Sequence, residues 1–161
     1  MEQGKLLEFK IVVLRLAGES FGVEITSVRE IGVMQEITPV PKTPPFVEGI
    51  INLRGSVIPI IDLRARLDLP RKVPDKDTRI IIAEMERFTV GMVVDAVTEV
   101  LTINREMVEE PSPVIANMDT AFMAGVAKLD QRLIILLDLE RVLDLSEKRA
   151  LGEVCAELAQ V

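Results

Sequence analysis

The 161-residue chain lacks histidine, tryptophan and tyrosine, and it contains a single cysteine, Cys155. Without histidine it has neither the commonest general base nor the commonest metal ligand of proteins. One cysteine cannot form an internal disulfide, which fits a reducing compartment. The absence of histidine and of further cysteines also excludes a structural zinc site, although carboxylates could still hold a hard cation. Cys155 itself lies near the buried side of an expected helix, has no evident basic neighbour, and is interpreted as inert.

Aromatic residues, all of them phenylalanine, make up 3% of the chain, too few for a stacking platform for bases or an aromatic groove for proline-rich peptides. The net charge of −7 disfavours binding to a phosphate backbone. No apolar run reaches the roughly 20 residues of a membrane span, and the first ten residues do not resemble a signal peptide. We therefore expect a cytoplasmic protein that binds no nucleic acid and does not insert into the membrane.

The residues that are present centre on the stretch 46–63, FVEGIINLRGSVIPIIDL. Two runs of aliphatic residues flank a short polar segment in which Gly55 can adopt a positive φ where the chain reverses. Pro59 cannot donate a hydrogen bond to a neighbouring strand, so it marks an edge or a bulge. This stretch predicts a β-hairpin.

The same pattern recurs without a gap at 122–139, FMAGVAKLDQRLIILLDL. Six of the eighteen positions are identical, against about one expected from ordinary residue usage. The identical pairs are Phe46/Phe122, Gly49/Gly125, Leu53/Leu129, Ile58/Ile134, Asp62/Asp138 and Leu63/Leu139. A second pair of similar segments, VREI at 28–31 and VTEV at 97–100, extends the similarity between the two copies upstream. An internal duplication accounts for both.

Each half of the duplication contains about five short strands separated by turns. Small repeated β units close into barrels or sandwiches, which cover their edges. The predicted fold is therefore mainly β, with two small five-stranded β-barrels, short helices and a C-terminal helix at 146–159. Ser146 is the expected N-cap of that helix.

The stretch FVEGIINLRGSVIPIIDLRARL, preceded by FGVEITSVREI and followed by GMVVDAVTEVL, resembles the CheW family, the coupling adaptors of bacterial chemotaxis. The resemblance covers the chain from about Leu7 to Leu145. It implies a single CheW-like domain, 1–161, with two intertwined SH3-like barrels. We place barrel 1 at 15–78 and barrel 2 at 7–14 plus 79–145.

The resemblance implies no enzyme activity and no cofactor. The implied partners are the cytoplasmic tip of chemoreceptors (methyl-accepting chemotaxis proteins) and the regulatory domain of the chemotaxis histidine kinase, in arrays beneath the membrane. The residues that match the family's partner-binding positions are Val28, Glu30 and Ile31 for kinase or receptor contact, Gly49 and Arg54 for coupling, and Val97 and Val100 for a receptor-binding groove between the barrels. Ala96 departs from the pattern, since glycine is common there.

Each of these residues also has a purely structural interpretation. Arg54 at a turn can be a solvated cation or form an internal salt bridge, and Glu30, repeated as Glu99, can simply solvate an outer face. For Val97 and Val100 we leave core and interface open, whereas we expect an interface role for Val28 and Ile31. Gly49 and Gly125 are expected to serve backbone geometry. Asp62 and Asp138 end strands, where they can accept hydrogen bonds from turn N–H groups, and we prefer this role to a catalytic dyad.

Two functional classes are thus compared. The first is a non-catalytic adaptor with two separate recognition surfaces. The second is a small β-barrel enzyme that uses carboxylates, although the chain has no histidine, no activated thiolate and no glycine-rich phosphate loop. A deep pocket with converging Asp or Glu side chains would favour the enzyme, and exposed aliphatic residues at the family's binding positions would favour the adaptor.

Overall fold

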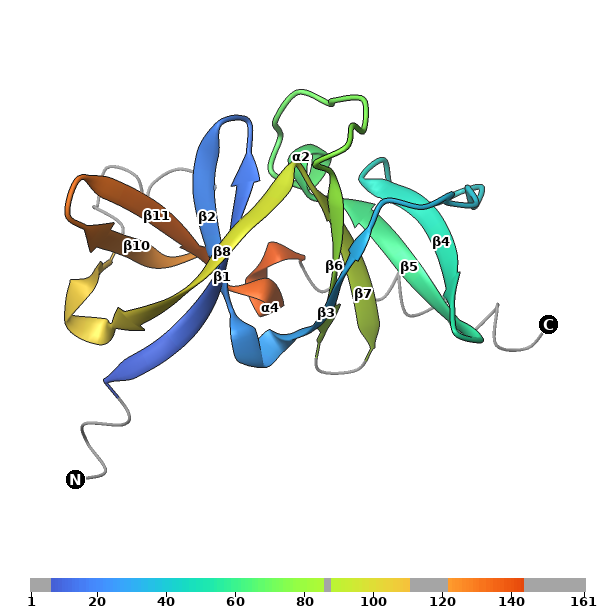
Figure 1. Ribbon diagram of the computed structural model, residues 1–161. Coiled ribbons are helices and arrows are strands. Elements are labelled where there is room, and N and C mark those ends of the chain that lie inside the picture. Colours follow the sequence, from blue (N-terminus) through green and yellow to red (C-terminus); the bar gives the residue numbers. More distant parts are fainter. Residues whose placement is uncertain (1–6, 86–87, 111–121, 144–161) are drawn as a thin grey trace.

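The computed structural model describes residues 7–85, 88–110 and 122–143, which form two β-sheets with short helices (Figure 1). The predicted helix at 146–159, with Ser146 and Cys155, lies outside these residues. Within the described part of the chain, no helix is long and apolar enough to cross a bilayer. The predicted fold class, mainly β with two barrel-like sheets, is confirmed.

Sheet A has six strands and sheet B has five. Sheet A has the order β8-β1-β2-β11-β10-β9 and comprises β1 (Glu8–Leu16), β2 (Glu19–Glu24), β8 (Ala96–Asn104), β9 (Val108–Glu109), β10 (Met123–Leu129) and β11 (Arg132–Leu137). Sheet B has the order β3-β6-β7-β5-β4 and comprises β3 (Val28–Val33), β4 (Val47–Leu53), β5 (Ser56–Asp62), β6 (Arg79–Glu84) and β7 (Thr89–Val94). The helical segments are η1 (Ile25–Ser27), α2 (Leu63–Arg66), η2 (Arg105–Met107) and α4 (Leu139–Val142).

The two copies of the repeat exchange their first hairpins. Sheet A combines the β1–β2 hairpin of the first copy with strands β8, β10 and β11 of the second, and sheet B combines the β6–β7 hairpin of the second copy with β3, β4 and β5 of the first. The exchange is symmetric, because β1 pairs with β8 as β6 pairs with β3, and the parallel pair β2–β11 matches the parallel pair β7–β5.

The sheets therefore divide the chain differently from the predicted limits of 15–78 and 7–14 plus 79–145. Sheet B takes its strands from 28–94, and sheet A takes its strands from 8–24 and 96–137. The predicted limit at residue 15 falls inside β1, whose register with β2 runs from Ile11 to Leu16. The two strands of a hairpin pair with each other and therefore belong to the same sheet. Both strands of each exchanged hairpin are accordingly found in the sheet of the other copy.

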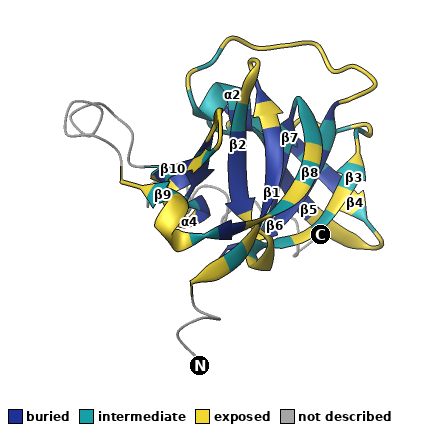
Figure 2. Cartoon of the chain, turned by 60° about the vertical axis from the view of Figure 1, so that its left-hand side comes forward, coloured by how far each residue is buried: buried dark blue, intermediate teal, exposed yellow. Residues whose placement is uncertain are grey.

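The hydrophobic core has three parts. One cluster of buried residues is enclosed by the barrel-like sheet A, one by sheet B, and the largest lies between the two sheets. Successive residues of β1 alternate, because Ile11 and Val13 pack inside sheet A while Val12, Leu14 and Leu16 pack between the sheets. The corresponding strand β6 behaves in the same way: its residues at 80 and 82 pack inside sheet B, and those at 81 and 83 pack between the sheets. Figure 2 shows the central strands largely buried, whereas β3 and β8 carry alternating intermediate and exposed residues. The core between the sheets joins both halves into one unit.

Candidate partner-binding surfaces

The edge strand β3 carries Val28 and Ile31 on the side of the core between the sheets. Ile31 lies opposite Ile81, and Val28 lies opposite Ala83. Directly opposed residues of antiparallel strands point to the same face, and both of these partners belong to the core between the sheets. Val28 is half-buried against that core, whereas Ile31 is 41% exposed. The apolar surface between the sheets therefore continues outward to the edge of sheet B.

The edge strand β8 repeats this arrangement at the edge of sheet A. Val97 lies opposite Leu14 and Val100 lies opposite Val12, and again both partners belong to the core between the sheets. Val97 is half-buried against the core, whereas Val100 is 51% exposed. We call Val28 with Ile31 the β3 edge, and Val97 with Val100 the β8 edge. In each pair the second residue is the one available to a partner.

Sequence reasoning missed further exposed aliphatic residues. Val33 is 67% exposed and lies two residues beyond Ile31 in the same strand, so the two-residue period of a strand could have identified it. Val57 and Leu133, at corresponding positions of the two copies, are both exposed at the starts of β5 and β11. The repeat itself could have marked this pair.

Glu30 lies on the opposite face of β3, where it pairs with Arg54. It is opposite Ile82, which packs inside sheet B. Arg54 Nη2 donates to Glu30 Oε1, and Arg54 Nη1 lies 3.4 Å from Glu30 Oε2. The hydrogen bond from Arg54 lowers the pKa of Glu30 below its ordinary value. The pair joins β3 to the turn between β4 and β5, so the internal salt bridge considered for Arg54 is present.

The turn that carries Arg54 has the backbone that the sequence predicts. Arg54 has φ 50° and Gly55 has φ 89°, and the side chain of Asn52 accepts a hydrogen bond from Gly55 N at 2.8 Å. Both central residues of a type I′ hairpin turn need a positive φ, which glycine accommodates readily. The arginine side chain is consequently held 71% exposed at the tip of the hairpin.

The second copy retains this ion pair with a shifted arginine. Glu99 corresponds to Glu30, and Arg132 Nη2 lies 3.2 Å from Glu99 Oε2. Asp130 occupies the position of Arg54 and has the same φ of 50°. A carboxylate on each edge strand thus contacts an arginine of the hairpin in the same sheet, and only the position of the arginine differs.

Gly49 is buried and acts through its backbone. Its φ is 146°, and Ile50 exchanges hydrogen bonds of 2.9 Å with Thr38. A Cβ atom at Gly49 would overlap the carbonyl oxygen of Thr38. A Cβ atom at the corresponding Gly125 would lie 2.7 Å from Val108 Cγ1 and 3.0 Å from the carbonyl oxygen of Glu109, so it too would crowd its neighbours. This bears out the backbone role expected for both glycines, so any effect of Gly49 on a partner acts through the backbone.

Asp62 and Asp138 have the structural role expected for them. Asp62 Oδ1 accepts a hydrogen bond from Arg64 N at 3.0 Å and caps α2, and Asp138 Oδ1 does the same for Glu140 N and α4. Asp62 is the last residue of β5 in sheet B, and Asp138 directly follows β11 in sheet A. They do not form a dyad.

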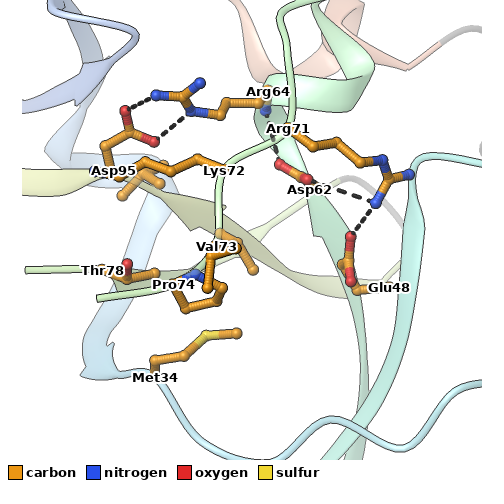
Figure 3. A pocket seen from close by; sticks show the side chains of 12 residues that line it. Met34, Glu48, Asp62, Arg64, Arg71, Lys72, Val73, Pro74, Thr78 and Asp95 are labelled. Atoms are coloured by element: carbon orange, nitrogen blue, oxygen red, sulfur yellow. Dashed lines mark hydrogen bonds and ion pairs between the residues drawn. The ribbon is translucent and has the colours of Figure 1, made fainter. Parts of the chain in front are cut away.

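A largely buried ion pair connects the two sheets. Arg64 Nε and Nη2 donate to the two carboxylate oxygens of Asp95 at 2.7 and 2.5 Å (Figure 3). The backbone N–H of Ala17 donates to the same carboxylate at 2.9 Å. Both charged side chains are 14% exposed. Burial alone would raise the pKa of Asp95, but the hydrogen bonds from Arg64 and Ala17 outweigh it, and the pKa lies below its ordinary value. The pair links α2, the crossover between sheets and the β1–β2 turn.

A cavity of about 330 Å³ lies beside this ion pair (Figure 3). Its three carboxylates each face an arginine: Asp95 faces Arg64, and Glu48 and Asp62 both face Arg71. In the part of the chain that the structure describes, no group of three or more His, Cys, Asp or Glu residues is placed to hold a metal ion. The arrangement is a charge-balanced network, and no observation at this cavity favours the enzyme hypothesis.

Comparison with known proteins shows what the chain as a whole is similar to. Residues 10–147 match the family described as CheW-like domain. The chain is 36% identical to a probable chemotaxis protein CheW of Rhizobium etli, over 88% of this chain and 91% of that protein. It is 32% identical to the chemotaxis protein CheW of Klebsiella aerogenes, over 96% and 92%. The crystal structure of the scaffolding protein TtCheW from Thermoanaerobacter tengcongensis superposes with a TM-score of 0.79 at 43% identity, covering 86% of this chain and 94% of that one.

Proposed function

The chain belongs to the CheW-like domain family, and on that premise we propose that it is a non-catalytic adaptor that couples chemoreceptors to the chemotaxis histidine kinase. The observation that carries the proposal is the presence of exposed aliphatic residues on both edge strands, at the positions that match the family's binding residues. A site of action in the cytoplasm, at receptor arrays beneath the membrane, follows from this role.

The β8 edge is the proposed receptor contact. Val100 offers a half-exposed aliphatic side chain, and Val97 connects it to the core between the sheets. An amphipathic helix of a receptor tip could place its apolar face there, with anchors one helical turn apart. Because Val100 sits on a strand backed by a packed core, little ordering is needed when the partner binds.

The β3 edge and the adjacent hairpin tip are the proposed kinase contact. Ile31 supplies an aliphatic anchor, and the Glu30–Arg54 pair on the other face of the strand supplies charged groups near it. Apolar anchors surrounded by polar groups are typical of recognition sites. Gly49 allows the close approach of the chain at Thr38, which follows β3 in the sequence.

The two contacts lie on different sheets that share one core. Arg64 and Asp95 fix the sheets to one another in addition to the apolar contacts. A change in the receptor could then reach the kinase as a change in relative position, provided that the contact free energies differ between signalling states.

Separate binding measurements test the proposal. The full-length chain is immobilised, and a purified kinase regulatory domain or a receptor coiled-coil fragment is added at micromolar concentration. We expect saturable binding of each partner alone. If neither partner binds in this range, the adaptor proposal is contradicted.

A further inference from the structure

A single residue, Asp95, forms one of the two crossovers between the sheets. Strand β7 of sheet B ends at Val94 and β8 of sheet A begins at Ala96, so the chain passes from one sheet to the other through Asp95 alone. The other crossover, from β2 to β3, runs through the three residues of η1. Because one residue contributes only two soft backbone dihedrals, the conformation of Asp95 bears directly on how the two sheets lie relative to each other.

Hydrogen bonds from both sheets converge on Asp95. From the side of sheet B, Arg64 on α2 donates with Nε to Oδ1 and with Nη2 to Oδ2. From sheet A, the N–H of Ala17 donates to Oδ2, and Asp95 N donates in turn to the carbonyl oxygen of Arg15 at 3.0 Å. The third nitrogen of the arginine, Nη1, donates to the carbonyl oxygen of Pro70 at 2.7 Å. We call the contacts of Asp95 with Arg64 and Ala17 the Arg64 clasp.

The clasp also holds a turn in an uncommon backbone conformation. Ala17, in the turn between β1 and β2, has φ 53°, in a region that residues with a side chain rarely adopt. Such conformations persist where the surrounding structure determines them. The hydrogen bond to Asp95 is a contact of this kind, and it ties the β1–β2 turn of sheet A to the crossover.

The clasp has a direction that the apolar core between the sheets does not supply. Burial of apolar surface is non-directional, whereas a bidentate arginine–carboxylate pair has a defined geometry. Both side chains of the clasp are 14% exposed, so salt screens their interaction less than that of an exposed pair. The clasp is therefore suited to define the angle between the sheets, while the core supplies most of their attraction.

The clasp has no counterpart at the corresponding positions of the repeat. At the offsets of 69 and 76 residues, Asp95 corresponds to Thr26 and Arg64 corresponds to Glu140. Neither of these residues is basic, so the two positions cannot form an ion pair with each other. The aspartates that cap α2 and α4, in contrast, recur in both copies. A contact that each unit needs in order to fold would be expected in both, so the clasp serves the joining of the two units.

We propose that the Arg64 clasp is the positioning element of the adaptor. It fixes the angle between the two sheets, and hence between the β3 edge and the β8 edge, so that a change in the receptor reaches the kinase. This inference rests on the proposed function and divides it into two parts. Recruitment requires only that each edge binds its partner, whereas transmission requires the two edges to be held in a defined relative position.

Spin-label distances test the position of the sheets without any partner. The labels are attached at Val57→Cys in sheet B and Leu133→Cys in sheet A, both exposed, in a protein that carries Cys155→Ala. Arg64→Lys keeps the positive charge but loses the planar fork that contacts both carboxylate oxygens. We expect this variant to shift or broaden the distance distribution between the labels. An unchanged distribution would overturn the proposal, whether or not the partners bind.

Arg71→Lys is the matched control for this measurement. Arg71 lines the same cavity as Arg64, but its contacts are with Glu48 and Asp62, which both belong to sheet B. The control should therefore leave the distribution as in the wild type. Asp95→Glu, which moves the carboxylate by one methylene group, should act in the same direction as Arg64→Lys. It takes the place of that variant if Arg64→Lys does not unfold cooperatively.

Kinase activity at equal recruitment tests the functional part of the proposal. Unlabelled full-length protein is added to receptor-bearing vesicles until the same amount of kinase sediments with the wild type and with Arg64→Lys. We expect the variant to bind each partner with unchanged affinity. The receptor-dependent change in kinase activity should fall by at least about fivefold, the low end of typical couplings between sites.

Two results of this measurement would overturn the positioning role. A full response of the kinase with Arg64→Lys would show that transmission does not need the clasp. Weaker binding of either partner to the variant would show that the clasp supports the edges themselves. Failure of the wild type to bind either partner would instead contradict the adaptor proposal, and the spin-label distances would then decide the positioning role of Arg64 by themselves.

Discussion

Arg54 and Glu30 show, at the scale of single residues, how an exposed ion pair can serve orientation more than stability. Both charged groups are in contact with solvent, where ion pairs contribute little to the free energy of folding. The pair nevertheless fixes a long side chain relative to β3, next to an exposed isoleucine. The second copy has a similar pair, Glu99 with Arg132. This recurrence supports a role for both pairs in shaping the tips of the hairpins.

Replacing Arg54 by alanine should weaken partner binding and leave the fold intact. The expected melting temperature lies within about 2 °C of the wild type, because only an exposed pair is lost. Binding of the kinase regulatory domain should fall by about tenfold. Thermal unfolding and titration with the kinase domain check the two expectations. Arg29→Ala, which removes the exposed ion pair between Arg29 of β3 and Glu84 of β6, is the matched control. Unfolding of the Arg54 variant at ordinary temperature would show that the residue is structural.

Substitution of Gly49 should lower the stability of the fold. In Gly49→Ala the new Cβ would meet the carbonyl oxygen of Thr38 at a backbone φ that disfavours side chains. We expect a loss of about 2–4 kcal/mol in the free energy of unfolding. Gly55→Ala, where a Cβ meets nothing within 4 Å, should cost about 1 kcal/mol. Urea denaturation of both variants measures the difference, and equal losses would contradict the backbone role of Gly49.

At the scale of the elements, local features were predictable and long-range pairing was not. The hairpin at 46–63 was predicted because its two aliphatic runs and Gly55 are adjacent in sequence, and β4 and β5 form there. The duplication was predicted because Gly49 and Asp62 recur with the same spacing. The resemblance implies intertwined barrels and assigns 7–14 to the second, but the residue pattern does not show that the whole hairpins β1–β2 and β6–β7 are exchanged, since this depends on which of two similar edge strands each hairpin contacts. Duplicated strands carry the same apolar pattern, so the pattern alone does not distinguish the partners.

The same limit applies to the candidate site. The resemblance to the CheW family singles out Val28 and Ile31 as binding positions, but how far each is exposed depends on the edge position of β3 and on the register shift after Val28. The sequence leaves core and interface open for Val97 and Val100 for the same reason. The register with β1 places both on the face of the core between the sheets, where Val97 is half-buried and Val100 is exposed. The Arg64–Asp95 pair gave no signal in the sequence, because its members are 31 positions apart and the second copy has no equivalent pair.

The Arg64–Asp95 pair gives the connection between sheets a predictable pH dependence. Since the pKa of Asp95 is lowered in the folded protein, its contribution to stability is present above the unfolded pKa of about 4 and is lost as the pH falls through the folded pKa. Asp95→Asn should therefore be less stable than the wild type by about 3 kcal/mol at pH 7.

Urea denaturation between pH 7 and pH 3 measures this difference. The gap between wild type and variant should stay constant down to about pH 5 and narrow below about pH 4. Asp77→Asn, on an exposed loop, is the control and should show little gap at any pH. A gap for Asp95→Asn that does not change with pH would mean that the carboxylate charge is not what stabilises this junction.

At the scale of the whole molecule, the exchange of hairpins produces two similar edges on one body. The β3 edge and the β8 edge derive from corresponding positions of the repeat, yet they differ in sequence and in surroundings. A duplicated unit thus supplies two candidate binding surfaces, as the proposed adaptor requires if it is to join two different partners. Since both edges rest on one core, a rigid connection between the partners follows.

Charge insertion at the two edges should separate the two partners. Val100→Arg places a cation at the β8 edge and should reduce receptor binding by at least about tenfold, with a smaller effect on kinase binding. Ile31→Arg at the β3 edge should show the reverse selectivity. Both residues are exposed, so neither variant should lose its cooperative unfolding transition. Equal loss of both partners in Val100→Arg would contradict the assignment of the surfaces.

A sedimentation experiment tests the central claim most directly. Receptor-bearing vesicles and a fixed amount of kinase are mixed with increasing concentrations of the chain, and the kinase that sediments with the vesicles is measured. An adaptor with two separate surfaces predicts that sedimented kinase first rises, passes through a maximum, and then falls, because excess adaptor occupies receptor and kinase separately. The maximum should disappear with Val100→Arg. Kinase that sediments to the same extent with and without the chain would contradict the account.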